Sequence, residues 1–285
     1  MSTTHAIKVK SRTSAGAWVL RIVLALFSLL VILPILWAFY SSFKTNTEYL
    51  TSAWALPSGL NWENYVNAIV KANMGDYFLT SIWVTALSLV ILTVVTVPCS
   101  YVLSRFKFKL NKLISAFIMA GLFINANYLV VPIFLQLKNG LLNNRLILCV
   151  VYAGSTLPFY IYLLSSFLGS IPKDYEEAAT IDGCGYWRTM LNVIVPMAKP
   201  GLITVMMFGF MSYWNEYMLS LTLITDPMKR TLPVGLKNLM EIQKYATDWG
   251  AMFAGLVLVM VPTMVFYACV QKKLTSGIAM GGIKG

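Results

Sequence analysis

Residues 176–196 of this chain read EEAATIDGCGYWRTMLNVIVP, a charged, glycine-containing segment between two long apolar segments. Asp174, just before it, is placed to cap a new helix, and Glu177 stands three residues later at the capping-box position. Gly183 can adopt the left-handed conformation that ends a helix. The pattern therefore predicts a helix of about two turns over residues 175–182.

The predicted helix has a face suited to contact with another protein. On a 3.6-residue repeat, one side is shared by Tyr175, Ala178, Ala179 and Asp182. Alanine side chains let a partner backbone approach closely, while Glu177 and Asp182 offer carboxylates to basic residues. A short helix joined at both ends to membrane spans can transmit the rigid-body movement of a partner. The alternative is that Glu177 only caps the helix and the segment only connects two spans.

Composition and hydrophobic patterning predict an all-α, polytopic membrane protein. The chain has 285 residues, of which 58% are hydrophobic and 12% charged, against roughly 25% charged in an average soluble domain. A bilayer crossing needs about 20 apolar residues. The sequence predicts six such spans, at about 21–42, 78–104, 113–137, 146–169, 201–224 and 250–271. A soluble protein with six wholly buried helices would have almost no surface, which area scaling excludes at this length. Residues 1–20 are then a cytoplasmic tail, and residues 21–285 one transmembrane domain.

The basic residues predict that both termini are cytoplasmic. Under this topology the inner segments hold most of the 22 Lys and Arg residues, as the positive-inside rule expects. The loop after the second span carries a short run of them, namely Arg105, Lys107, Lys109 and Lys112. The polar segment 172–196, between the fourth and fifth spans, is then cytoplasmic too. Anionic membrane lipid accounts for the net charge of +11, so no nucleic-acid partner is predicted.

Several kinds of chemistry are missing from this sequence. His5 is the only histidine, so His-based catalytic triads and His-rich zinc sites are excluded. No Gly-x-x-x-x-Gly-Lys-Ser/Thr loop is present to hold ATP. Glu216 is the one acidic residue inside a predicted span, whereas ion-coupled carriers need several buried ionisable groups. We therefore expect no enzyme activity, metal or cofactor in this chain, and transport powered by another polypeptide.

The segment 176–196 resembles the signature of the membrane-spanning subunits of ATP-binding-cassette (ABC) importers. That signature has Glu-Ala-Ala, three residues, Gly, nine residues and a hydrophobic-x-hydrophobic-Pro ending. It is matched by Glu177, Ala178, Ala179, Gly183, Val193, Val195 and Pro196, while Cys184 stands where the family often has alanine. The resemblance implies that the predicted helix is a cytoplasmic coupling helix that docks on a separate ATPase. Its coupling residues would be Glu177, Ala178, Ala179, Asp182 and Gly183.

Further motifs, spread over most of the chain, resemble the carbohydrate-importing, maltose-type branch of that family. They are Leu56-Pro57 with Asn61 to Tyr65, Gly140 to Asn144, Trp214 to Tyr217, Thr231 to Leu236, and the ending Gly281 to Gly285, where Gly282 and Ile283 depart from the family's Ala-Val. The resemblance implies a heterodimer with a sister permease subunit, an ABC ATPase dimer that holds ATP and Mg, and an external solute-binding protein. It also implies import of a sugar, with an oligosaccharide favoured, across the bacterial inner or plasma membrane.

Polar and aromatic residues inside the predicted spans are candidates for a substrate path. They are Asn125, Asn127, Tyr128, Trp214, Asn215 and Glu216, with Tyr160 and Tyr162 in the fourth predicted span. A carboxylate inside a span is costly and normally faces the bundle interior or water. Glu216 and Asn215 can therefore bond sugar hydroxyls while Trp214 or Tyr217 stacks on a ring. The alternative is that these side chains bond neighbouring helices and only hold the bundle together.

Three other functions stay open on the sequence. The same kind of importer can carry another polar solute, such as a polyol or glycerol phosphate, although the interior of the predicted spans offers no basic residue to a phosphate. An ion-driven carrier is disfavoured because Glu216 stands alone. A structural or assembly protein without a transport role would leave the docking signature unexplained.

Overall fold

The computed structural model describes residues 15–242 and 248–281, and every regular element within these ranges is helical. Most of the predicted tail 1–20 and the terminal residues 282–285 lie outside them. The α-helices are α1 (Ala15–Ser41), α2 (Asn46–Thr51), α3 (Glu63–Val66), α4 (Met74–Arg105), α5 (Asn111–Gly121), α6 (Ala126–Leu137), α7 (Arg145–Gly169), α8 (Asp174–Ile181), α9 (Tyr186–Thr189), α10 (Val195–Met197), α11 (Lys199–Trp214), α12 (Met218–Leu223), α13 (Leu232–Ile242) and α14 (Trp249–Gly281). The other elements are the π-helices η1 (Asn67–Lys71) and η2 (Met190–Ile194) and the 3₁₀-helix η3 (Pro227–Lys229).

Several helices are long and apolar enough to cross a membrane. Four qualify by themselves: α1 over Gly16–Ser41, α4 over Met74–Arg105, α7 over Arg145–Gly169 and α14 over Trp249–Gln271. Two bent helix pairs also qualify if each pair counts as one span. The described residues therefore hold four to six candidate spans, and the prediction of an all-helical protein with several membrane crossings is confirmed.

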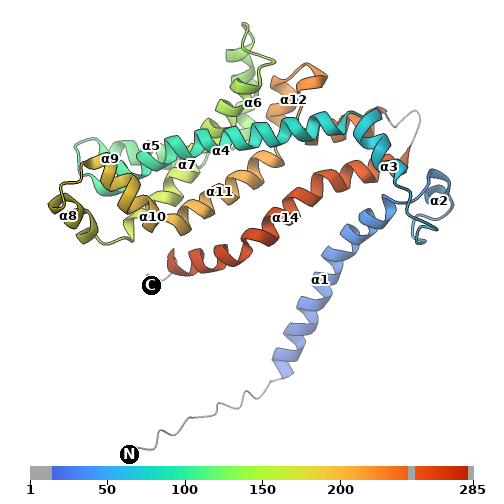
Figure 1. The fold of residues 1–285 in the computed structure, drawn as a ribbon, viewed down its shortest axis with the longest axis horizontal. Helices are drawn as coiled ribbons and strands as arrows, with labels where there is room; N and C mark the ends of the chain where they lie inside the picture. Colours follow the sequence, from blue (N-terminus) through green and yellow to red (C-terminus); the bar gives the residue numbers. More distant parts are fainter. Residues whose placement is uncertain (1–14, 243–247, 282–285) are drawn as a thin grey trace, which may run out of the picture.

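The long helices form an elongated bundle. α4 runs along its length, α7 and α11 pack against α4, and α14 packs on α11 (Figure 1). The short helices α8, α9 and α10 lie at one end, the α8 end, and α2 and α3 lie at the other, the α2 end. α1 meets the bundle near the α2 end and then diverges from it, so most of its apolar side chains are exposed. Such a helix is suited to contact with lipid or another membrane subunit.

The third predicted span, 113–137, is not one straight helix. α5 and α6 take its place, and their axes differ by 99°. Asn125 starts α6, because its side-chain oxygen accepts a hydrogen bond from the backbone N–H of Asn127 at 2.9 Å. At the end of α5, a Cβ on Gly121 would lie 2.8 Å from the ring of Pro158 on α7. Glycine therefore permits the close approach of α5 to α7 at the bend.

The fifth predicted span, 201–224, is also interrupted. α11 ends at Trp214, and α12 starts a few residues later. The carboxylate of Glu216 accepts hydrogen bonds from the backbone N–H groups of Leu219 at 2.7 Å and Ser220 at 3.1 Å. It thereby satisfies free donors at the start of α12. A break inside a membrane is tolerated where neighbouring groups satisfy the freed backbone in this way.

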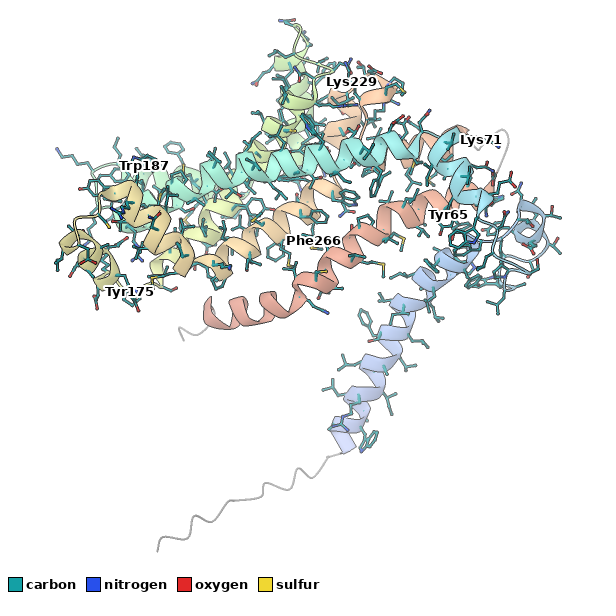
Figure 2. All side chains as sticks on the ribbon, in the orientation of Figure 1. Tyr65, Lys71, Tyr175, Trp187, Lys229 and Phe266 are labelled. Carbon is teal, nitrogen blue, oxygen red and sulfur yellow. The ribbon has the colours of Figure 1, made fainter. Side chains whose placement is uncertain are left out.

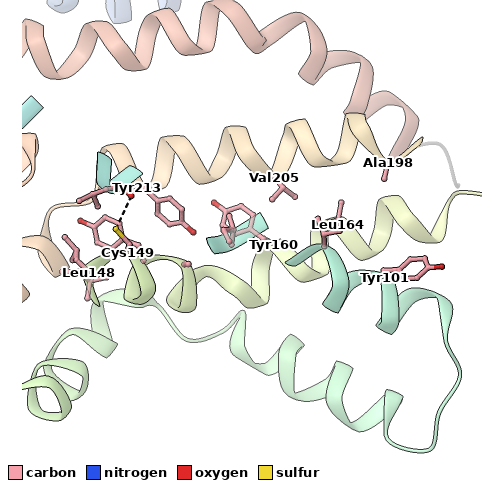
Figure 3. Close-up of a cluster of buried hydrophobic side chains, with 14 of the residues drawn as sticks. Tyr101, Leu148, Cys149, Tyr160, Leu164, Ala198, Val205 and Tyr213 are labelled. Atoms are coloured by element: carbon pink, nitrogen blue, oxygen red, sulfur yellow. Dashed lines mark hydrogen bonds between the residues drawn. The ribbon is translucent and has the colours of Figure 1, made fainter. Parts of the chain in front are cut away.

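The hydrophobic core follows the contact of α4, α7 and α11. Figure 3 shows it extending along α7 and α11, from Leu148 and Tyr213 at one end to Tyr101 and Ala198 at the other. Leu92 of α4 and Leu148 of α7 are fully buried in it. Helices in a membrane associate through such close packing, because lipid tails remove the usual hydrophobic driving force.

The α2 end is closed by an aromatic cluster. Its members are Trp37, Tyr49, Trp54, Trp249 and Phe253, whose neighbouring ring centroids lie 4.9 to 6.3 Å apart. Beside it, Lys44 is fully buried, and its Nζ donates hydrogen bonds to backbone carbonyls of the segment after α2, at 3.0 and 2.9 Å. Burial lowers the pKa of the Lys44 ammonium. These contacts fasten α2 to the ends of α1 and α14.

Candidate functional site

The short helix predicted in the polar segment is present as α8, Asp174–Ile181. Its C-terminal end has the two hydrogen bonds of a Schellman motif. The N–H of Gly183 donates to the carbonyl of Thr180 at 3.0 Å, and the N–H of Cys184 donates to that of Ala179 at 2.9 Å. Gly183 has a φ of 77°, in the left-handed region that suits glycine. The prediction that Gly183 ends the helix is confirmed.

The N-terminal end of α8 differs from the prediction. Lys173 takes the cap position without a side-chain hydrogen bond, and Asp174 is already helical, so the capping-box pair of Asp174 and Glu177 is not formed. The reason is that the carbonyl of Lys173 accepts the N–H groups of Glu176 and Glu177, which starts the first turn one residue early. Asp174, Glu176 and Glu177 instead place negative charge in the first turn of α8, where the helix dipole stabilises it.

The two alanines of the signature do not share an exposed face. Ala179 is buried in the chain itself, with 5% of its surface exposed, whereas Ala178 and Glu177 are exposed. The predicted contact face is therefore divided, because α8 packs on η2 and buries Ala179. Ile181 is 87% exposed. Ile181 was not among the predicted coupling residues, although a single large aliphatic residue in an acidic helix is itself a signal of a contact surface.

Aromatic side chains accompany Ile181 at the α8 end. Tyr186 and Trp187 belong to α9, which contacts α8, and they are 76% and 70% exposed. Figure 2 shows Trp187 at this end of the molecule, together with Tyr175 of α8. We call Ile181, Tyr186 and Trp187 the exposed apolar surface. Beyond α10 the chain turns by 79° into α11, so this surface belongs to a segment that lies across the end of the bundle.

Arg105, the last residue of α4, is bound to the α8 segment. Its Nε lies 3.4 Å from Oε1 of Glu176, and its Nη1 donates to the carbonyl of Ile171 at 2.8 Å. Arg105 was predicted only to mark the cytoplasmic side, and Glu176 was not among the predicted coupling residues. No local pattern pairs the two, because they are far apart in the sequence.

An open hollow of about 520 Å³, which we call the chamber, lies between α5, α7 and α11. Hydroxyl groups line it, from Ser155, Thr156, Tyr160, Tyr162 and Ser212. Phe159 and Phe208 add aromatic rings, which meet edge to face at 6.3 Å between centroids. Small-molecule sites commonly have volumes of about 300–1,000 Å³. The chamber therefore combines a suitable size with groups that bind polar, ring-shaped molecules.

Two hydrogen bonds and a pair of stacked rings connect the chamber to Glu216. The hydroxyl groups of Thr156, in the chamber wall, and Tyr213 are 2.7 Å apart. The ring of Tyr213 stacks on that of Tyr152 with 5.7 Å between centroids, and the Tyr152 hydroxyl donates to Oε2 of Glu216 at 2.6 Å. Glu216 is thus bonded to a neighbouring helix as well as to the start of α12. This geometry favours the bundle-holding alternative for Glu216.

The other predicted path residues lie outside the chamber wall, whereas Tyr160 and Tyr162 line it. Trp214 is buried, and its Nε1 donates to the carbonyl of Val259 at 3.1 Å, which joins α11 to α14. Asn215 bonds the preceding turn of its own helix. Asn125, Asn127 and Tyr128 are exposed at the start of α6, and they follow Ile124, which lines the chamber, in the sequence. Small hydroxyl residues such as Ser155 and Ser212 were not candidates, because such residues are common wherever membrane helices pack.

Comparison with known proteins assigns the family. Residues 96–278, which include α8 and the chamber, match the family described as "Binding-protein-dependent transport system inner membrane component". The diacetylchitobiose uptake system permease protein NgcG of Streptomyces coelicolor is 40% identical over 259 residues, which are 90% of this chain and 86% of the relative. The probable starch degradation products transport system permease protein AmyC of Thermoanaerobacterium thermosulfurigenes is 30% identical, over 89% of this chain and 94% of the relative.

The fold is also found among solved structures. A chain in the crystal structure of a bacterial ABC transporter involved in the import of the acidic polysaccharide alginate superposes with a TM-score of 0.80 at 23% identity, over 95% of this chain and 99% of that chain. The family match, the extent of the similarity to permease proteins and the several membrane-crossing helices agree with one another. This chain therefore belongs to the family of binding-protein-dependent transport system inner membrane components, as a multi-pass permease subunit of an ABC importer in the cell membrane.

Proposed function

We propose that this subunit forms half of the path by which an oligosaccharide enters the cell, and that a separate ATPase powers the transport. In this arrangement six spans cross the membrane, and both termini and the α8 end are cytoplasmic. A sister permease subunit forms the other half of the path. An external solute-binding protein delivers the sugar at the α2 end, and a dimer of ABC ATPase subunits holds ATP and Mg at the α8 end.

The observation that carries the proposal is the exposed apolar surface at the α8 end. Ile181 and Trp187 are 87% and 70% exposed, and burial against a partner is the usual reason for such a surface. The acidic side chain of Glu177, also exposed, suits a basic residue of the ATPase. When ATP draws the two ATPase subunits together, α8 moves with them. The bundle then tilts against its sister, so that the path opens to alternate sides of the membrane.

The chamber favours a sugar over an ion or a phosphate ester. Its hydroxyl groups can exchange hydrogen bonds with sugar hydroxyls, and Phe159 and Phe208 can pack on the apolar face of a ring. Its lining residues include no Lys or Arg, so a phosphate group finds no cationic partner there. Relatives named for diacetylchitobiose and for starch degradation products support an oligosaccharide as the cargo.

The proposal is tested by reconstituting the whole transporter in lipid vesicles, with the sister permease, ATPase and binding protein encoded by neighbouring genes. We expect ATP hydrolysis to rise when the binding protein carries its oligosaccharide, and labelled sugar to accumulate in the vesicles. Diacetylchitobiose and malto-oligosaccharides are the first cargoes to assay, and a polyol and glycerol phosphate represent the alternative class. Hydrolysis that responds to no loaded binding protein would overturn the proposal.

A substitution at Ile181 tests the docking surface directly. Ile181→Glu places a charge in the proposed interface, so we expect the ATPase to separate from the membrane subunits during purification and uptake to fall about tenfold. Leu110→Glu is the matched control, because Leu110 is also an exposed aliphatic residue, at 57%, in the loop that precedes α5. Equal losses in the two variants would mean that α8 is not the docking element.

A further inference from the structure

The ion pair of Arg105 and Glu176 joins α8 to α4 in a protected position. The side chain of Arg105 is 4% exposed and that of Glu176 is 19% exposed. Arg105 also holds the start of the α8 segment, through the hydrogen bond from its Nη1 to the carbonyl of Ile171 at 2.8 Å. Both residues are partly buried, so removal of one partner leaves the charge of the other only partly solvated and uncompensated. The α8 segment is therefore held to α4 at two points by one side chain.

An aromatic contact at the next residue links α4 to α9. Phe106 meets the ring of Tyr186 at 5.7 Å between centroids and that of Tyr101, one turn back on α4, at 5.6 Å. Tyr186 belongs to the exposed apolar surface. Both α8 and α9 thus contact residues at the C-terminal end of α4, so displacement of this segment by the ATPase reaches α4 directly as well as α7 and α11, which the chain joins to it.

α4 connects this end of the molecule to the other. Its 32 residues span about 48 Å at 1.5 Å per residue. Near its first turns, Oγ of Ser81 accepts a hydrogen bond from the backbone N–H of Leu232 at 2.7 Å, at the start of α13. Tyr77 lies so close to Gly235 that a Cβ there would collide with the tyrosine ring. α13 belongs to the loop that precedes α14, so α4 contacts an outer loop at one end and the α8 segment at the other.

We propose that Arg105 is the positioning residue that passes the movement of α8 to α4, and that α4 carries it to α13 at the opposite face. This inference rests on the proposed docking of an ATPase at α8. Because coupling between two sites is reciprocal, the same contact lets a binding protein seated at the α2 end stimulate the ATPase. In the proposed assembly Arg105 touches neither ATP nor sugar. Its loss therefore uncouples ATP hydrolysis from the binding protein, while the ATPase and the binding protein both stay bound.

The test uses the assembled transporter in vesicles, with Arg105→Gln, Glu176→Gln, the double variant and the charge exchange Arg105→Glu/Glu176→Arg. We expect each single variant to keep the ATPase bound and to keep its basal hydrolysis, while the stimulation by loaded binding protein falls about tenfold. The double variant should be no worse than either single one, because both remove the same interaction. The charge exchange should recover part of the stimulation. Lys109→Gln, an exposed basic residue in the following loop, is the matched control and should behave as wild type.

The outcomes separate this inference from the function on which it rests. If wild-type membrane subunits do not retain the ATPase, the proposed docking fails, and the role of Arg105 fails with it. If the ATPase is retained and both single variants keep full stimulation, docking stands and the role of Arg105 is overturned. Losses that multiply in the double variant also overturn it, since they show independent effects. Failure of both single variants to assemble would make the pair a folding contact and would equally contradict a role in coupling.

Discussion

The two ends of the bundle are built in opposite ways. At the α2 end, aromatic rings contact one another: Trp37 meets Phe253 at 5.1 Å, and Tyr49 stacks on Trp249 at 4.9 Å. At the α8 end, Trp187 is 70% exposed, and the described residues place no other aromatic ring against it. The α2 end buries even a lysine, whereas the α8 end is held to the end of α4 by an ion pair, a hydrogen bond and a ring contact, and leaves Ile181 87% exposed.

This difference separates folding from function. At the α2 end the internal contacts of Trp37, Tyr49 and Asn64 hold the helices together, although Trp54 and Leu56 stay 78% exposed at its surface. Substitutions at those internal contacts should lower the stability of the subunit. In the proposed assembly the ATPase covers the α8 end, so substitutions of its exposed residues should leave stability unchanged and alter transport. Three matched pairs of substitutions, one member at each end, test this division.

The largest effect is expected from a pair of glycines. A Cβ on Gly250 would collide with the side chain of Asn64, whose Nδ2 donates to the carbonyls of Ser42 and Lys44 at 2.8 Å each. Gly250→Ala should therefore lower the free energy of unfolding by about 3 kcal/mol, through overpacking and the loss of buried hydrogen bonds. Thermal and denaturant unfolding of the transporter in lipid nanodiscs measures the change.

The control at the other end is Gly185→Ala. A Cβ at Gly185 would meet nothing within 4 Å, so the free energy of unfolding should change by less than about 0.5 kcal/mol. A loss at Gly185 as large as that at Gly250 would contradict the division, because it would show that the α8 end also depends on its own close packing.

A pair of tryptophans should give a smaller effect. Nε1 of Trp37 donates to the carbonyl of Ala53 at 3.0 Å, and Trp37→Phe removes this bond while it keeps an aromatic ring. The expected loss is about 1 kcal/mol of unfolding free energy. Trp187→Phe should leave stability unchanged, because the indole is exposed. Stability that falls for Trp187→Phe and not for Trp37→Phe would reverse the assignment of the two ends.

Much of the fold could be predicted from the sequence, but only where the signal lay in neighbouring residues. The long apolar segments predicted the long helices, because hydrophobicity is a property of each residue in the segment. Gly183 predicted the end of α8, because glycine itself can adopt the left-handed backbone conformation. The signature also predicted a short helix in the right place. These features depend on the chain within a few residues of each position.

The remaining features depend on tertiary contacts. Ala179 turned inward because α8 packs on η2, and no periodicity within α8 indicates which side that will be. The bend between α5 and α6 is made by Asn125 and by the contact of Gly121 with α7, while the apolar pattern is the same for a straight helix. The chamber lies between helices distant in sequence. Arg105 and Glu176 likewise come together only in the folded bundle.

The smallest effect is expected from a pair of acids, and it depends on pH. At the α2 end, hydrogen bonds from Ser58 and then from Thr45 lower the pKa of the Glu48 carboxyl to about 2, from a usual value of 4.5. A carboxyl with a lowered pKa stabilises the fold when it is ionised, so its contribution is complete above about pH 4.5 and is lost as the pH falls toward 2. Glu48 is only partly buried, so solvent keeps the contribution small.

The melting temperature of the wild type relative to Glu48→Gln shows this contribution. The wild type should be the more stable at neutral pH, and its advantage should shrink below about pH 4.5. Ser58→Ala removes the principal hydrogen-bond donor to Glu48 and should reduce the same advantage. Glu177→Gln at the α8 end should have only a small effect on melting, because Glu177 is exposed and solvent weakens its interaction with the helix dipole. If the Glu48 difference does not vary with pH, the carboxylate does not hold α2 to its loop, and the α2 end is closed by its aromatic cluster alone.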